Sequence, residues 1–77
     1  MNDFTGKVAV VTGASRGIGA AVAHALHERG ASVGLASRSG DDLGLERSVA
    51  LPTDVRDRAQ VQALVDATAE RFGGIDI

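Results

Sequence analysis

The stretch that most constrains the fold lies near the N-terminus and runs VAVVTGASRGIG from Val8 to Gly19. Its first four residues are small and apolar, and three of them are β-branched, which is typical of a strand buried on both faces of a parallel sheet. Gly13, Gly17 and Gly19 follow, where a helical pattern begins. N–H groups at a helix N-terminus attract anions, and glycine lets a phosphate come close to the backbone. Strand, glycine turn and helix therefore predict a site for a nucleotide pyrophosphate; the alternative is a tight turn without a ligand.

Composition narrows the class of protein. The chain has 77 residues, no cysteine, a net charge of −2 and only two aromatic residues, Phe4 and Phe72. A negative chain with few aromatic side chains is a poor nucleic-acid binder. The lack of cysteine gives no indication of disulfides or a zinc site, and no apolar run is long enough for a signal peptide or a membrane span. We expect a cytoplasmic α/β protein without nucleic-acid or membrane partners.

The rest of the chain alternates between helical and strand patterns. Apolar spacing predicts a helix over residues 17–29 that stops at Gly30. Strands are expected at residues 31–36 and 48–51, the second closed by Pro52. Residues 37–47 are polar and rich in glycine, and leave room for one short helical turn at most. An amphipathic helix is expected over residues 57–72, and residues 75–77 as the opening of a fourth strand.

This order, β-α-β-short α-β-α-β, predicts an α/β fold with a doubly wound parallel sheet and right-handed crossovers. Ligands of such sheets bind at the carboxyl ends of the strands, which here are residues 12–19, 37–39 and 53–55. A chain that stops inside a strand leaves an unfinished sheet with an exposed edge. We therefore expect residues 1–77 to be the N-terminal part of a single, larger dinucleotide-binding domain.

The glycine spacing is T-G-x-x-x-G-x-G rather than the G-x-G-x-x-G of the common dinucleotide fingerprint. Together with A-S-R after the second strand and D-V after the third, it resembles the coenzyme signature of the short-chain dehydrogenase/reductase family. The resemblance covers all 77 residues and is greatest to NADP(H)-using members such as 3-oxoacyl-carrier-protein reductase. It implies a Rossmann-type fold, hydride transfer between the nicotinamide and a small carbonyl or alcohol substrate, and a homo-oligomer, dimeric or tetrameric.

The end of the second expected strand predicts the choice of cofactor. An acid there would bond the ribose 2′-hydroxyl of NAD(H), whereas arginine accommodates the 2′-phosphate of NADP(H). This chain has Ser37 and Arg38 there, and its next acid is Asp41. Guanidinium donors match phosphate oxygens, and the missing acid removes a repulsion. The family resemblance implies that Arg16 and Arg38 clamp the 2′-phosphate, so we predict NADP(H) over NAD(H); the alternative is that both arginines are solvated surface charges.

The resemblance also implies roles in binding adenosine and pyrophosphate. Asp54 would accept a hydrogen bond from the adenine amino group, although it could instead cap the helix that begins near residues 56–57. Val55 would line the adenine pocket, Ile18 would offer its backbone N–H to the pyrophosphate, and Ser15 would reach the ribose or its phosphate. The predicted cofactor-binding residues are Gly13, Ser15, Arg16, Gly17, Ile18, Gly19, Ser37, Arg38, Asp54 and Val55.

No catalytic residue and no metal ligand is predicted. The family's hydride transfer uses a serine, a Y-x-x-x-K pair and an asparagine, whereas this chain has no tyrosine and its one lysine is Lys7. His24 and His27 have a spacing that could hold a metal, but we interpret them as surface histidines. Residues 41–42 and 56–58 are interpreted as solvated charge clusters.

Three alternatives to an oxidoreductase segment remain open at this point. One is a binding or regulatory protein that keeps the nucleotide site without catalysis. Another is a truncated product that does not fold alone. A third, a methyltransferase, would favour an acid where Ser37 and Arg38 lie.

Overall fold

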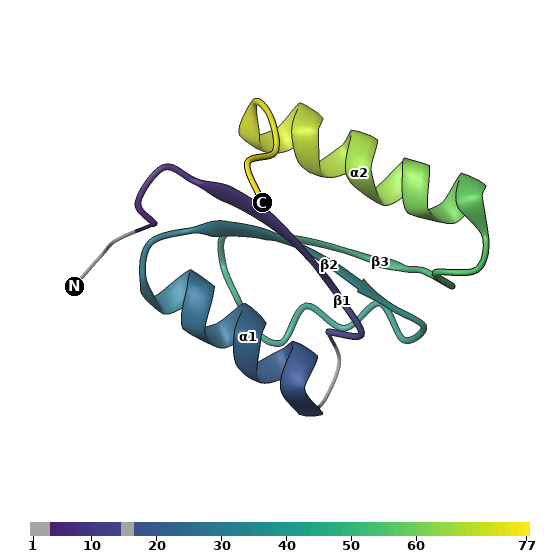
Figure 1. The fold of residues 1–77 in the computed structure, drawn as a ribbon, viewed down its shortest axis with the longest axis horizontal. Coiled ribbons are helices and arrows are strands. Elements are labelled where there is room, and N and C mark those ends of the chain that lie inside the picture. The colour runs from purple at the N-terminus through teal and green to yellow at the C-terminus, as the bar shows by residue number, and fades with distance from the viewer. Residues whose placement is uncertain (1–3, 15–16) are drawn as a thin grey trace.

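The computed structural model describes residues 4–14 and 17–77, in which three parallel strands lie between two helices (Figure 1). The strands are β1 (Val8–Thr12), β2 (Ser32–Ser37) and β3 (Ser48–Pro52), in the order β1-β2-β3. Helix α1 (Gly17–Glu28) covers one face of the sheet and α2 (Arg58–Phe72) covers the other. The predicted α/β architecture is confirmed, with each element within one residue of its expected bounds. Within the described ranges, no helix is long and apolar enough to cross a membrane.

Both faces of the sheet are apolar, which explains the continuous apolar run of β1. On the α2 face, Leu64 and Thr68 are buried, and a Cβ added to Gly34 of β2 would overlap the Thr68 side chain. Glycine at this position thus lets α2 pack directly on the central strand. On the α1 face, the buried cluster comprises Ala9, Val11, Ala14, Ala23, Val33 and Leu35.

Helix α2 begins after Asp57 rather than after Asp54. The Asp57 carboxylate accepts hydrogen bonds from the N–H groups of Ala59 and Gln60, at 3.0 and 3.3 Å. This satisfies the first turn of the helix, and Gly73 ends the helix in a left-handed conformation with φ 87°. The alternative role of Asp54 as the cap of this helix is therefore wrong.

The connection between β2 and β3 contains no helical turn, contrary to the short helix expected there. Gly40, Leu43 and Gly44 have φ values of 71°, 57° and 72°, which a right-handed helix cannot accommodate. Instead, the carboxylates of Asp41 and Asp42 each accept an N–H two residues further on, at 2.8 and 2.9 Å. These turns direct the side chains of Leu43 and Leu45 onto the core beneath α1, so the segment covers this face without a helix.

Residues 75–77 do not form the expected fourth strand, but they hydrogen-bond to β1. The Val8 carbonyl accepts from the N–H groups of Asp76 and Ile77 at 2.8 and 3.1 Å, and Val10 N–H donates to the Ile77 carbonyl at 3.0 Å. The preceding carbonyl, that of Lys7, bonds Ser32 at the start of β2. Because successive carbonyls point to opposite edges, residues 75–77 lie on the edge of β1 away from β2. Three residues make too few bonds for a regular strand.

Candidate nucleotide-binding site

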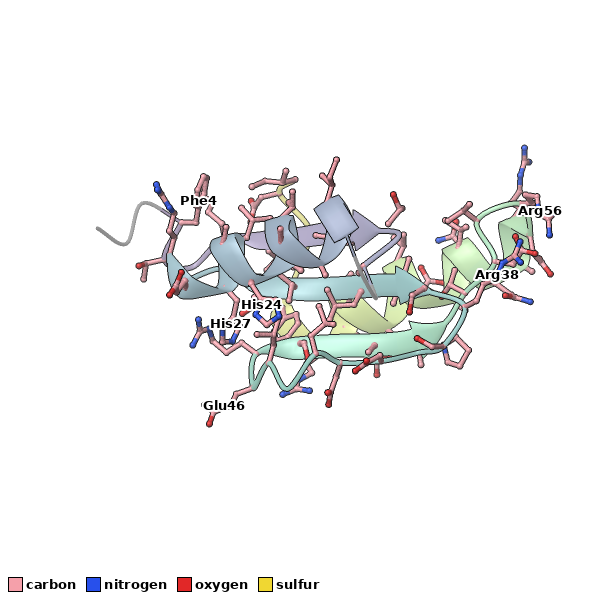
Figure 2. The ribbon with its side chains drawn as sticks, turned by 90° about the horizontal axis from the view of Figure 1, so that it is seen from below. Phe4, His24, His27, Arg38, Glu46 and Arg56 are labelled. Carbon is pink, nitrogen blue, oxygen red and sulfur yellow. The ribbon has the colours of Figure 1, made fainter. Side chains whose placement is uncertain are left out.

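A cavity of about 270 Å³ lies where the three strands end. This is the carboxyl edge of the parallel sheet, where α/β proteins of this topology bind their ligands. Arg38 and Arg56 lie together at this end of the molecule, whereas His27 and Glu46 lie at the opposite end (Figure 2). The cavity is lined by Gly13, Ala36, Ser37, Arg38, Thr53, Asp54, Val55 and Arg56.

The three glycines that follow β1 have two different structural roles. Gly13 and Gly17 have left-handed φ values of 60° and 65°, and a Cβ at either would meet nothing within 4 Å. Their backbone is therefore sharply bent and open to a bound group. A Cβ at Gly19 would instead overlap the Gly13 carbonyl oxygen, so Gly19 lets α1 pack on the turn.

The first turn of α1 faces the same end of the sheet. It contains no acidic residue, so no carboxylate within it offsets the partial positive charge of the helix N-terminus. The Ile18 side chain in this turn is 84% exposed. Ser15 and Arg16, both predicted to contact the cofactor, lie outside the described residues.

Backbone hydrogen bonds join the three turns that form the cavity. Ala14 N–H donates to the Ala36 carbonyl at 3.2 Å, and Thr53 N–H donates to the Ser37 carbonyl at 2.6 Å. The Ser37 hydroxyl is buried and accepts the Gly40 N–H at 3.2 Å. Ser37 therefore fixes the start of the loop from which Arg38 extends, with 74% of the Arg38 side chain exposed.

The Asp54 carboxylate lies between two guanidinium groups. Its Oδ1 accepts hydrogen bonds from the backbone N–H and the Nε of Arg56, at 2.9 and 3.1 Å. Its Oδ2 accepts from Arg56 Nη2 at 3.0 Å and lies 4.0 Å from Arg38 Nη2. The hydrogen bonds from Arg56, aided by the charge of Arg38, lower the pKa of Asp54 from its ordinary 3.8 to about 2. The carboxylate is thus ionised at any pH near neutrality.

The turn that holds Asp54 is fixed to the start of α2. Asp54 N–H donates to Gln60 Oε1 at 2.8 Å, and Gln60 Nε2 donates to the Asp57 carboxylate at 3.2 Å. Thr53 is buried, and its hydroxyl donates to the Leu51 carbonyl at 2.8 Å. The Val55 side chain is 57% exposed beside the cavity. These hydrogen bonds hold the backbone on which the Asp54 carboxylate is carried, so its position does not depend on the Asp54 side chain alone.

The predicted residues fall into two adjoining groups. Five of them line the cavity, and three others lie in the first turn of α1. The remaining two lie between these groups in the sequence, at positions 15 and 16, outside the described residues. The cavity group is Gly13, Ser37, Arg38, Asp54 and Val55, and the helix group is Gly17, Ile18 and Gly19.

Sequence reasoning missed Arg56, which was interpreted as part of a solvated charge cluster. Arg56 is indeed solvated, with 75% of its side chain exposed, but the interpretation did not anticipate that this side chain binds both oxygens of Asp54. The signal was the spacing of Asp54 and Arg56, which lets an acid and an arginine two residues apart pair within one turn.

His24 and His27 lie away from the cavity. His24 is exposed, whereas His27 accepts the Arg47 N–H on its Nε2 at 3.2 Å, and the His27 carbonyl accepts from Arg47 Nη2 at 2.6 Å. Partial burial lowers the pKa of His27 below 6.5, and the charge of Arg47 lowers it further. His27 therefore links the end of α1 to the residue before β3.

With this geometry established, comparison with known proteins identifies the family. The sequence pattern of the short chain dehydrogenases matches residues 7–77. The chain belongs to this family. It is 43% identical to an uncharacterized oxidoreductase of Staphylococcus haemolyticus, covering 100% of this chain and 36% of the relative. It is 50% identical to glycine betaine reductase of Emericella nidulans, covering 96% of this chain and 6% of the relative.

Solved structures of short-chain dehydrogenases have the same fold. A short chain dehydrogenase from Burkholderia cenocepacia in complex with NADP superposes with a TM-score of 0.87 at 40% identity, over 97% of this chain and 35% of that one. Glucose dehydrogenase of Caenorhabditis elegans in its apo form gives a TM-score of 0.85 at 28% identity, over 96% and 36% of the two chains. The chain therefore spans about a third of the length of these relatives and of the staphylococcal oxidoreductase.

Proposed function

We propose that residues 1–77 are the coenzyme-binding part of an NADP(H)-dependent short-chain oxidoreductase. The observation that carries the cofactor preference is the end of β2, where Arg38 extends beside the cavity and Ser37 stands in place of an acid. Among the described residues that line the cavity, two are arginines and one is an acid, which suits an anionic ligand. The Burkholderia cenocepacia relative binds NADP, which supports the same cofactor here.

Three parts of the cofactor have a counterpart in the proposed site. The pyrophosphate would lie on backbone N–H groups at Gly13 and in the first turn of α1, where the backbone of Gly13 and Gly17 is open. The adenine would lie against Val55 and donate a hydrogen bond from its amino group to Asp54. The 2′-phosphate would bind Arg38, with Arg16 as the second predicted contact. When bound, the nicotinamide would supply the hydride, and the residues of this site would hold the adenosine and pyrophosphate portion of the cofactor.

The whole protein is proposed to reduce a carbonyl or oxidise an alcohol on a small molecule. The sequence motifs resemble those of NADP(H)-using members such as 3-oxoacyl-carrier-protein reductase, so a substrate of that class is the first to test. The 77 residues include no tyrosine, so they do not supply the family's proton donor. The proposal also includes a homo-oligomer, as the resemblance implies, and a location in the cytoplasm, as expected from the composition.

The cofactor preference is tested by titration calorimetry of the purified protein with NADPH and NADH. We expect tighter binding of NADPH by at least about tenfold, because hydrogen bonds to charged groups contribute about 1.5–3 kcal/mol. Arg38→Asp should reverse the preference, since a carboxylate repels the 2′-phosphate and accepts from the 2′-hydroxyl. Arg58→Asp makes the same change of charge on α2, outside the cavity lining, and should leave the preference unchanged. A wild-type preference for NADH would contradict the proposal.

A nucleotide-binding protein without catalysis is the second candidate. This candidate is compatible with the residues that we predict to be functional, because all of them are assigned to binding and none to catalysis. Consumption of NADPH by the purified protein with carbonyl substrates distinguishes the two. Turnover supports the oxidoreductase, whereas NADPH binding without turnover across ketone and 3-oxoacyl substrates supports the second candidate.

A further inference from the structure

The two arginines beside the cavity are held in different ways. Arg38 and Arg56 have nearly equal side-chain exposure, 74% and 75%, so burial does not distinguish them. Arg56 donates to both oxygens of Asp54 at 3.0–3.1 Å from its side chain, whereas the Arg38 guanidinium stays 4.0 Å from Oδ2. Asp54 therefore pairs with Arg56, although Arg38 lies within reach of the same carboxylate.

We propose that Arg56 determines cofactor specificity by occupying the Asp54 carboxylate, which leaves Arg38 available to the 2′-phosphate. The inference rests on the proposed NADP(H) site. Arg56 acts here as a positioning residue: it touches Asp54, and it acts on the phosphate through Asp54 and Arg38.

Asp54 and the 2′-phosphate would compete for Arg38. A carboxylate and a phosphate both match the paired N–H donors of a guanidinium, so they are rivals for the same group. Without Arg56, Asp54 would have Arg38 as its nearest partner, and the 4.0 Å separation needs to close by only about 1 Å to form a hydrogen bond. A 2′-phosphate would then have to displace Asp54 from Arg38.

Repulsion acts in the same direction. Asp54 is the only carboxylate among the described residues that line the cavity. The nearby Asp57 is already engaged by the N–H groups at the start of α2 and by Gln60. Neutralising Asp54 therefore removes the main local charge that would oppose a 2′-phosphate, and Arg56 is the residue that does so.

Pairing with Arg56 is compatible with the adenine contact proposed for Asp54. A carboxylate offers about four acceptor positions. Oδ1 accepts two hydrogen bonds from Arg56, whereas Oδ2 accepts one from it. A position on Oδ2 thus remains for an amino group, so Arg56 fixes Asp54 without blocking it.

The test uses the adenosine portions of the two cofactors, 2′,5′-ADP and 5′-AMP, as probes. Titration calorimetry of the purified protein at constant low ionic strength gives the ratio of their Kd values, which we call the phosphate selectivity. Arg56→Gln should lower this selectivity about fivefold, the size expected for one exposed ion pair. Arg58→Gln is the matched control and should leave it unchanged. Circular dichroism verifies that each variant is folded.

Two double variants show through which residue Arg56 acts. The loss of selectivity in Arg38→Gln/Arg56→Gln should be smaller than the product of the two single losses, because without Arg38 there is no competition for its guanidinium and only the repulsion by Asp54 remains. Asp54→Asn/Arg56→Gln should recover the wild-type selectivity, because asparagine keeps an acceptor for adenine and carries no charge to compete for Arg38.

The outcomes separate this inference from the proposed function. An unchanged selectivity in Arg56→Gln would give Arg56 a structural role only, and losses that multiply fully in the double arginine variant, or no recovery in Asp54→Asn/Arg56→Gln, would mean direct phosphate contact. Either result overturns the inference while the NADP(H) site stands. A wild-type protein that shows no preference for 2′,5′-ADP would overturn both.

Discussion

The two ends of the parallel sheet use their polar groups differently. At the end where the strands begin, polar groups pair with one another across elements: Arg47 binds the last turn of α1, and Arg71 of α2 donates to the Ser48 carbonyl at 3.0 Å. At the end where the strands finish, the backbone of Gly13 and Gly17 is open and Arg38 is largely exposed. The first end stabilises the fold, whereas the second keeps groups available to a ligand.

The direction of the helices explains this division. Both α1 and α2 follow a strand and run back along the sheet, so their N-termini lie at the carboxyl edge and their C-termini at the opposite edge (Figure 1). Cations near C-terminal carbonyls are favourable, which suits Arg47 and Arg71. Open N–H groups at the N-termini favour an anion. The same βαβ topology thus gives one end where polar groups pair with each other and one end that is suited to an anionic ligand. Substitutions at the end where the strands finish should change NADPH binding, whereas substitutions at the end where they begin should change only stability.

The largest effect is expected at Gly19. Gly19→Ala places a Cβ on the Gly13 carbonyl oxygen, so the start of α1 must move away from the turn. We expect a loss of about 3 kcal/mol of unfolding free energy, as for an overpacked site, and loss of detectable NADPH binding. Urea denaturation and calorimetry measure the two quantities. Gly44→Ala is the control: its φ of 72° is strained but its Cβ meets nothing, so it should cost about 1 kcal/mol and leave binding unchanged. Normal NADPH binding by Gly19→Ala would refute the account of this turn.

A smaller effect is expected at the opposite end of the sheet. Arg47→Gln removes the hydrogen bond from Nη2 to the His27 carbonyl, and should lower the unfolding free energy by about 1 kcal/mol. The affinity for NADPH should not change, because Arg47 does not line the cavity. Urea denaturation and calorimetry on the same preparation make the comparison. A variant that keeps its stability but loses NADPH binding would mean that the two ends are not separate.

The smallest effect concerns pH. Because the folded pKa of His27 lies below its ordinary 6.5, the hydrogen bond that neutral His27 accepts stabilises the protein above that value. This contribution is lost as the pH falls through the folded pKa, since protonated Nε2 cannot accept from Arg47. We expect the unfolding free energy to fall by less than about 1 kcal/mol between pH 7 and pH 5 through this bond. The fall should be smaller in His27→Gln; an equal fall in both proteins would assign it to other groups.

Most of the fold could be predicted because its signals are local. The apolar run of β1, the glycines before α1 and the apolar spacing of α2 each depend on neighbouring residues, and the structure places all three as expected. The turns after β2 were harder to predict, because Leu43 has a left-handed backbone conformation there, which leucine rarely adopts. Residues 75–77 showed the right pattern, but a strand also needs enough length to pair.

Residues of the candidate site could be predicted where their position depends on the end of a strand. They could not be predicted where their role depends on which side chain they pair with. Arg38 and Asp54 were predicted to lie together because Arg38 directly follows β2, Asp54 is the second residue after β3, and parallel strands bring such positions to one edge. Arg56 was missed because a long exposed side chain has many possible partners, and only the turn geometry selects Asp54. The cap of α2 was ambiguous for a similar reason: two aspartates precede the helix, and the backbone decides that Asp57 is the cap.

The most direct test of the central claim is a map of where 2′,5′-ADP binds. Amide chemical shifts of the ¹⁵N-labelled protein, followed by NMR during titration with this probe, report on both ends of the sheet at once. The account predicts saturable shifts at Gly13, Arg38, Asp54 and the first turn of α1, with His27 and Arg47 unchanged. Saturable shifts centred on His27 and Arg47, or none at the carboxyl edge, would contradict it.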